Sequence, residues 1–149
     1  MSPSESDNTL ERNKALVRRF VDTLINQRNP AAADDFLAAD FVDHNAPADQ
    51  PRGPEGVKRV TERVLSVLAD LRVEIDIIIA EGDRVAARHR AKARHVGNFM
   101  GVPATGKLLT WVTISIYRIE NNRIAERWGL IDHADLLRQL SDLDAKRMV

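Results

Sequence analysis

The chain has 149 residues, no cysteine, and 22 basic against 22 acidic side chains. This length suits one domain that buries a core without covalent staples, and the lack of cysteine excludes disulfides, thiolate zinc sites and cysteine nucleophiles. A net charge of zero gives no electrostatic reason to expect a nucleic acid or an anionic membrane as partner. The first residues are unlike a signal peptide and the longest apolar run, 77–80, is too short to span a bilayer, so we expect a cytoplasmic protein.

The N-terminal half shows helical periodicity. After a short disordered lead-in expected over residues 1–8, a capping box at Asn8 and Glu11 opens an amphipathic helix that ends near Asn29. A short helix is expected from Pro30, an extended piece over 41–44 and a proline-containing loop over 45–53. Pro54 then begins a third helix, which ends near residue 70.

The hydrophobic period changes from 3.6 to 2 near residue 70. Alternation predicts strands over 71–79, 85–95, 108–119 and 124–132, with turns at 81–83 and 120–123 and a Gly/Pro loop over 97–106. A short helix over 135–140 ends a single domain, which we place at 9–142 and which a tail over 143–149 follows. Helices that precede antiparallel strands indicate an α+β fold. A twisted sheet of this kind can curl around the first helix into a cone-shaped barrel with an internal apolar pocket.

Four segments resemble the SnoaL-like polyketide cyclases, a family of the nuclear-transport-factor-two-like superfamily. They are FVDH (41–44) with GPEG (53–56), EGDRVAAR (81–88), HVGNFMGVPATGK (95–107) and IAERWGLID (124–132). The resemblance implies a cofactor-free enzyme that closes a ring in a hydrophobic, polyketide-type carbonyl compound by intramolecular aldol reaction or related isomerisation. It places the acid/base on Asp132, a second catalytic group on His95 and a pocket arginine on Arg88.

The chain differs from the usual family pattern at two places. Ala93-Arg94 stand where Gly-Thr is usual, and Ala104 stands where proline is usual. The cation of Arg94 is a change that bears on which substrate the chain accepts, and the resemblance therefore predicts the fold more strongly than the activity.

From the residues alone, Asp132 has two interpretations. Glu126, Trp128, Leu130 and Asp132 share one face of a strand, and a carboxylate on an apolar wall beside an indole is desolvated in a way that favours proton transfer. Alternatively, Asp132 directly precedes the terminal helix and caps its first turn.

Five further residues are candidates for substrate binding or catalysis. His89 and His95 share the small-residue face of their strand, where alanines at 87, 91 and 93 leave room for a ligand. His44 lies beside the long loop and could bond a substrate oxygen from the pocket rim. Trp111 and Trp128 could form a flat aromatic wall. Each also has a plain structural interpretation, as a packing or surface residue.

A phosphate-binding loop and a metal site are both rejected. Residues 101–107 have the spacing of a phosphate loop, but Leu108 replaces the required Ser or Thr and a strand follows instead of a helix. We therefore read this segment as a hairpin loop. The four histidines and the carboxylates show no zinc spacing, and we expect neither a metal nor a cofactor.

Three other functions and one assembly are also considered. The chain could be an enzyme of the limonene-epoxide-hydrolase type that uses Asp132 with Arg88, a hydroxylase-associated relative, or a non-catalytic dimeric module that binds a small ligand. Both faces of the strand over 108–116 are largely apolar, so we expect a homodimer through the open sheet face. The polar face of the preceding strand, residues 88, 90, 92 and 94, is read as solvated or inter-subunit.

Overall fold

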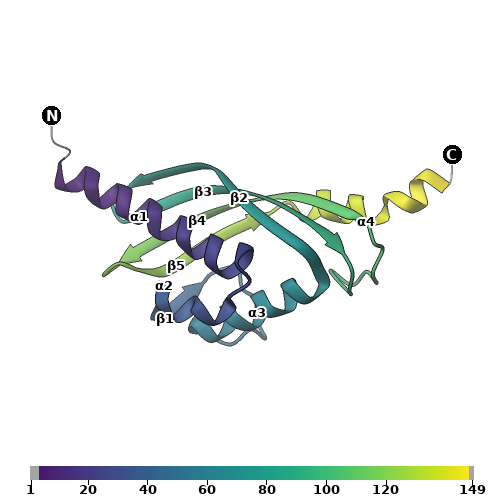
Figure 1. Cartoon of the computed structure of the whole chain (residues 1–149), viewed down its shortest axis with the longest axis horizontal. Coiled ribbons are helices and arrows are strands. Elements are labelled where there is room, and N and C mark those ends of the chain that lie inside the picture. The colour runs from purple at the N-terminus through teal and green to yellow at the C-terminus, as the bar shows by residue number, and fades with distance from the viewer. Residues whose placement is uncertain (1–3, 148–149) are drawn as a thin grey trace.

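Helices cover one side of a curved five-stranded sheet in the computed structural model, which describes residues 4–147 and the side chains of residues 4–141 (Figure 1). The helical elements are α1 (Glu5–Val21), η1 (Asp22–Asn26), η2 (Pro30–Ala32), α2 (Ala33–Phe36), α3 (Gly53–Val67) and α4 (His133–Arg147). None of the described helices is long and apolar enough to cross a membrane.

Helix α1 begins earlier than its sequence predicts. Ser4 is the N-cap: its hydroxyl accepts a hydrogen bond from the Asp7 backbone N–H at 3.2 Å, and the Asp7 carboxylate accepts one from the Ser4 N–H. This capping box replaces the one predicted at Asn8, so residues 5–8 of the expected lead-in are helical. Residues 1–3 lie outside the described part of the chain. At the other terminus α4 extends the predicted short helix to Arg147, well into the expected tail.

The sheet has the order β1-β5-β4-β3-β2. Its strands are β1 (Leu37–Asp43), β2 (Leu68–Glu81), β3 (Arg84–His95), β4 (Leu108–Glu120) and β5 (Arg123–Ile131). Strands β2 to β5 form the predicted antiparallel meander. However, β1 pairs with β5 in parallel, through Leu37 opposite Ile124, so the sheet is mixed and the prediction of a wholly antiparallel sheet is wrong. The reason lies in the connection: α3 carries the chain from β1 at one edge to β2 at the other, which frees β1 from hairpin geometry.

Two apolar clusters fill the concave side of the sheet. The first joins α1, α2 and β1 to β3, β4 and β5, and its buried members are Leu16, Val17, Leu24, Ala32, Ala33, Leu37, Phe41, Val85, Ala87, Tyr117, Ile119 and Ile124. The second lies under α4 and the end of α3, and its buried members are Leu68, Leu71, Ala91, Ala93, Leu109, Leu136 and Leu140. The predicted alternation of β3 therefore places its alanines inward, as expected.

The amide of Asn26 fastens the helical layer to β2. Its nitrogen donates to the Val73 carbonyl at 2.9 Å and its oxygen accepts from the Val73 N–H at 2.9 Å. A side-chain amide that bonds both backbone groups of one residue replaces a strand partner. The edge of β2 is thus covered where η1 reaches it.

Candidate functional site

A layer of polar side chains crosses the concave side between the two clusters. On the sheet, inward-facing His89 of β3 lies opposite Thr113 of β4, and Ser115 follows two residues later on the same face. Ser115 and His89 are 1% and 7% exposed. Polar groups at this depth are normally hydrogen-bonded, so each needs a partner.

Helix α3 packs over both clusters. Val57 packs on the first cluster and Val64 on the second, and Thr61 between them is 7% exposed. We call His89, Thr113 and Ser115 the polar layer.

Both ring nitrogens of His89 are bonded within the protein. Nδ1 lies 3.1 Å from the Thr113 carbonyl oxygen, which can only accept, so Nδ1 carries the proton. Nε2 then accepts from the Tyr117 hydroxyl at 3.0 Å. Burial lowers the pKa of His89 below its ordinary value, and the ring is neutral near pH 7. The predicted binding residue His89 therefore has no free polar atom for a substrate in this arrangement.

Tyr117 and an ion pair close the layer on the side of the first cluster. Burial raises the pKa of the Tyr117 phenol, while the charge of Arg127 and the neighbouring Ser115 hydroxyl act in the opposite, lowering direction. The Arg127 guanidinium pairs with the Asp43 carboxylate at 3.2 Å. The phenol stays protonated and the arginine charge is neutralised, so the layer has no net charge.

His95 lies at the other end of β3, fully buried. Its Nδ1 accepts from the Thr105 backbone N–H at 3.2 Å and lies 2.8 Å from the Thr105 hydroxyl. Since a backbone N–H can only donate, the proton of the neutral ring is on Nε2. This buried Nε2–H has no hydrogen-bond partner among the described residues.

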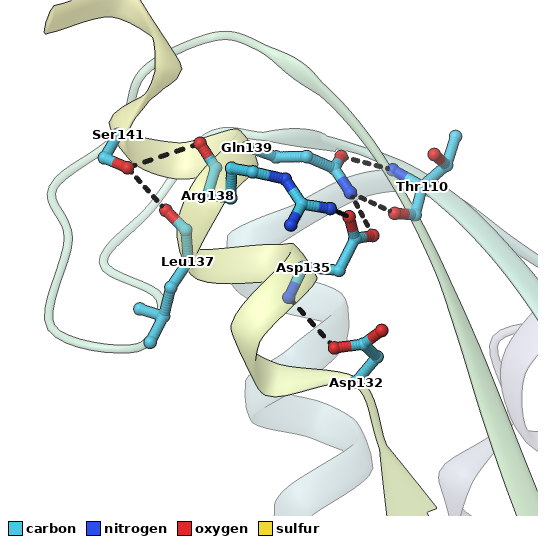
Figure 2. Close-up of polar contacts among 7 residues, drawn as sticks. All are labelled: Thr110, Asp132, Asp135, Leu137, Arg138, Gln139 and Ser141. Carbon is cyan, nitrogen blue, oxygen red and sulfur yellow. Dashed lines mark hydrogen bonds and ion pairs between the residues drawn. The ribbon is translucent and has the colours of Figure 1, made fainter. Parts of the chain in front are cut away.

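Asp132 occupies the junction of β5 and α4 (Figure 2). The side chain is exposed, and its Oδ1 accepts from the Asp135 backbone N–H at 3.0 Å. This is the helix-capping geometry that the sequence offered as one of two interpretations. Oδ2 receives no hydrogen bond from the described residues, so one carboxylate oxygen is fixed and the other is free.

The register separates Asp132 from His95. His95 lies opposite Lys107, the residue before β4, whereas Ile131 lies opposite Thr113, so Asp132 falls beside the residue before Thr113. Five residue steps of β4 separate these two levels, about 17 Å along the strand. The register therefore places Asp132 beside Val112, an outward-facing residue of β4, and about 17 Å from the level of His95.

The remaining predicted residues divide between the two faces of the sheet. Trp111 faces inward, opposite Ala91, and packs on the second cluster. Trp128 faces outward, opposite Ile116, and the His44 ring stacks on it at 4.8 Å between centroids. Arg88 also faces outward, where it pairs with a β2 carboxylate. The strand face that Trp128 and Asp132 were predicted to share is therefore the outer face of the sheet. The inward-facing residues of β4 next to this strand are Thr113 and Ser115, and neither of them lies opposite Trp128.

His44 belongs to an ion-pair group on that outer face. Its Nε2 lies 2.6 Å from the Glu126 carboxylate, whose other oxygen accepts from Arg118. The hydrogen bond from His44, followed by that from Arg118, lowers the pKa of Glu126 below its usual value. Within the described residues, no three or more histidine and carboxylate groups gather in a way that could hold a metal ion.

The fold and this site define a helix-covered, curved-sheet protein whose concave side carries a neutral polar layer. Comparison with known proteins gives the family: the model of the SnoaL-like polyketide cyclases matches residues 15–140, and the chain belongs to this family. The aklanonic acid methyl ester cyclase DnrD of Streptomyces peucetius is 28% identical over 130 residues, which cover 85% of this chain and 89% of that protein.

Solved structures agree with this assignment. TsrD from Streptomyces laurentii superposes with a TM-score of 0.81 at 30% identity, covering 87% of this chain and 95% of TsrD. IdmH from Streptomyces antibioticus superposes with a TM-score of 0.74 at 26% identity, covering 87% of this chain and 98% of IdmH. The family match favours a cyclase over the epoxide-hydrolase-like, hydroxylase-associated and non-catalytic alternatives.

Sequence reasoning missed most of the polar layer. Thr113 and Ser115 alternate with aliphatic residues on a β-rich strand and interrupt its apolar pattern. Those interruptions were the available signal, but periodicity alone does not tell which face of β4 is covered by helices. Tyr117 and Arg127 belong to the same inward face and were missed for the same reason.

Proposed function

We propose that the protein is a cofactor-free cyclase that closes a ring in a polyketide-derived carbonyl compound. In this reaction a base removes a proton from the carbon next to a carbonyl group, and the enolate carbon attacks a second carbonyl of the same molecule. The resulting alkoxide takes the proton back, so the product has the mass of the substrate. The concave side contributes by folding the substrate into the reactive pose.

Asp132 is the base in this proposal. The observation that supports it is the half-used carboxylate: the Asp135 N–H holds Oδ1, while Oδ2 receives no hydrogen bond from the described residues. A base held in this way is oriented by one oxygen and takes the proton with the other. Capping and catalysis are then compatible roles of one side chain.

His95 is the second proposed group. Its buried Nε2–H is fixed as a donor because Thr105 occupies Nδ1, and a donor of this kind stabilises a negative oxygen that develops in the reaction. Because His95 lies far from Asp132, we propose that it donates to a substrate oxygen that is far from the carbon that loses its proton to Asp132. That assignment requires a substrate long enough to span the second cluster.

Replacement of Asp132 tests the function. With a polyketide-derived keto ester as substrate, wild type should form a chromatographically new product of unchanged mass. Asp132→Asn should lower the rate at least about 100-fold, the usual size of a lost general base, while the free energy of unfolding stays near the wild-type value, since asparagine caps helices as well as aspartate.

Two further variants complete the test. Asp132→Ala should lose both the rate and about 0.5–2 kcal/mol of stability. Asp135→Asn, which alters the neighbouring half-buried carboxylate, should keep the rate. Wild-type turnover by Asp132→Asn would show that Asp132 only caps α4.

We also propose that the protein is a homodimer formed through the outer sheet face. Two neighbouring rows across β2 to β5 carry five aliphatic side chains that are 41–75% exposed: Ile77, Ile79, Ile114, Ile116 and Leu130. They leave on the order of 500 Å² of apolar surface in water, a size that marks interaction sites.

The strand ends on both sides of this apolar band carry charges of both signs. Glu81, Arg84, Arg118 and Glu126 lie side by side in one row across β2 to β5, and Arg90 lies opposite Glu74 on the other side. The occupant that we propose is therefore the same band of a second copy, which a two-fold axis parallel to the sheet brings face to face with it.

A further inference from the structure

The side-chain amide of Gln139 fastens helix α4 to strand β4 (Figure 2). Strand β5 ends at Ile131, opposite Thr113, and so does not reach Thr110. There the Gln139 Oε1 accepts from the Thr110 N–H at 3.1 Å, and Nε2 donates to the Thr110 carbonyl at 2.6 Å. One side-chain amide thus occupies both backbone groups of one residue, as a neighbouring strand would.

The same amide also bonds the first turn of α4. Its Nε2 donates to the Asp135 carboxylate at 2.9 Å, and the Asp135 N–H donates to Asp132 Oδ1 at 3.0 Å. An amide nitrogen has two protons, and here each has its own acceptor, so the three bonds hold the Gln139 side chain in one orientation. A series of contacts therefore runs from the backbone of β4 through Gln139 and Asp135 to the Asp132 carboxylate.

Helical geometry makes this attachment decisive for Asp132. Asp132, Asp135 and Gln139 are spaced i, i+3 and i+7, which places them on one side of α4 over about 10 Å. A helix joined to the sheet only through the end of β5 is free to tilt and to turn about its own axis. Leu136 and Leu140 hold it on the second cluster, but apolar contact is non-directional. The hydrogen bonds of Gln139 are what fix the rotation and height of α4 on β4.

A matching device on β2 provides a comparison within the same molecule. The Asn26 amide bonds both backbone groups of Val73 at 2.9 Å, and its nitrogen also donates to the carboxylate four residues earlier, Asp22, at 3.0 Å. Gln139 and Asp135 have the same spacing. The Asn26 contact joins η1 to β2 and involves none of the proposed catalytic residues, so it separates stabilisation of the fold from the positioning of Asp132.

We propose that Gln139 is a positioning residue for Asp132: it fixes α4 on β4, so that Oδ1 stays on the Asp135 N–H and Oδ2 keeps one direction. The inference rests on the proposed function, in which Oδ2 takes the proton. Gln139 itself touches no substrate. Its loss therefore slows the step in which Asp132 acts and leaves substrate binding unchanged, because general-base catalysis depends on the geometry of the base.

Kinetics of two matched variants test the proposal, with a polyketide-derived keto ester as substrate. Gln139→Leu should lower kcat about tenfold and leave KM within about twofold of wild type. Asn26→Leu is the control: it removes the same set of hydrogen bonds, so it should lower the melting temperature by a similar amount and keep kcat. A loss of kcat of equal size in the two variants would show that Gln139 only stabilises the fold.

A double variant shows whether Gln139 acts through Asp132. In the Asp132→Asn background, Gln139→Leu should lower the remaining rate by less than about twofold, because the effects of residues that act through one group are not additive. A further tenfold loss in that background would overturn the proposal.

Hydrogen exchange separates this inference from the proposed function. The Asp135 and Leu136 amides bond the carboxylate and the carbonyl of Asp132, and their exchange should accelerate at least about threefold in Gln139→Leu but not in Asn26→Leu. Faster exchange in a protein that forms no product of unchanged mass would keep the coupling of Gln139 to Asp132 and reject the cyclase. Unchanged exchange would reject the positioning role and leave the cyclase standing.

Discussion

At the scale of single residues, buried polar groups set how the protein responds to pH. His89 is held neutral, since burial lowers its pKa, whereas a histidine in the unfolded chain titrates near 6.5. The unfolded state thus takes up a proton more readily than the folded state does. Stability is complete above about pH 6.5 and falls as the pH drops below it.

Replacement of His89 should reduce this dependence. We expect the denaturant midpoint of wild type to fall between about pH 7.5 and pH 5.5, and the midpoint of His89→Gln to change less over the same interval. His133→Gln, at an exposed histidine, is the matched control and should keep the wild-type slope. An identical slope for wild type and His89→Gln would contradict the role of burial.

At the same scale, the two carboxylate oxygens of Asp132 lie in different environments. Its Oδ1 is used by the helix and its Oδ2 is free, so a capping geometry alone does not decide its chemistry. The asparagine variant separates the roles because it keeps the cap and removes the base.

At the scale of elements, α4 replaces a strand. Strand β5 ends at Ile131, opposite Thr113, and leaves the earlier part of β4 without a partner on that side. The Gln139 amide takes over: its Oε1 accepts from the Thr110 N–H at 3.1 Å, and its Nε2 donates to the Thr110 carbonyl (Figure 2). Leu136 and Leu140 then cover the second cluster.

Removal of this amide should loosen α4. Gln139→Leu leaves both backbone groups of Thr110 without their protein partner, so we expect a loss of about 1–2 kcal/mol of stability. Hydrogen exchange at the Thr110 amide should accelerate most. Arg138→Ala, which alters an exposed neighbour on α4, should leave that exchange unchanged, and protection of Thr110 in Gln139→Leu would contradict this description of the β4–α4 contact.

At the scale of the whole molecule, the sheet has one face covered by helices and one face that remains apolar and exposed. Leu130, at 75%, is the most exposed large apolar side chain of the described residues and lies in the central band of the outer face. A second copy would bury it, and stable pairs typically bury about 800 Å² per partner.

A charge in that band should separate the copies. Light scattering at micromolar concentration should give twice the chain mass for wild type and the single-chain mass for Leu130→Arg, because two buried arginines without partners oppose association. Leu137→Arg provides the control, since this residue is 47% exposed on α4, away from the band, and should stay dimeric. A monomeric wild type would refute the assembly.

The sequence by itself determined the change from helices to a strand meander, the inward alanines of β3 and the family. These depend on local periodicity and on motifs that lie within one segment. It also placed Asp132 directly before the last helix, where the capping hydrogen bond to the Asp135 N–H is found.

Only the tertiary structure decided the parallel position of β1, the outward face of Trp128, His44 and Arg88, and the inward face of Thr113 and Ser115. An alternation with a period of two residues shows which residues share one face of a strand, but it does not show which face the helices cover. That choice is made by long-range packing of α1 and α3 on the sheet, where the burial of apolar surface outweighs local preference. The polar layer exists because β3 and β4 place His89, Thr113 and Ser115 on the covered face at neighbouring levels of the sheet.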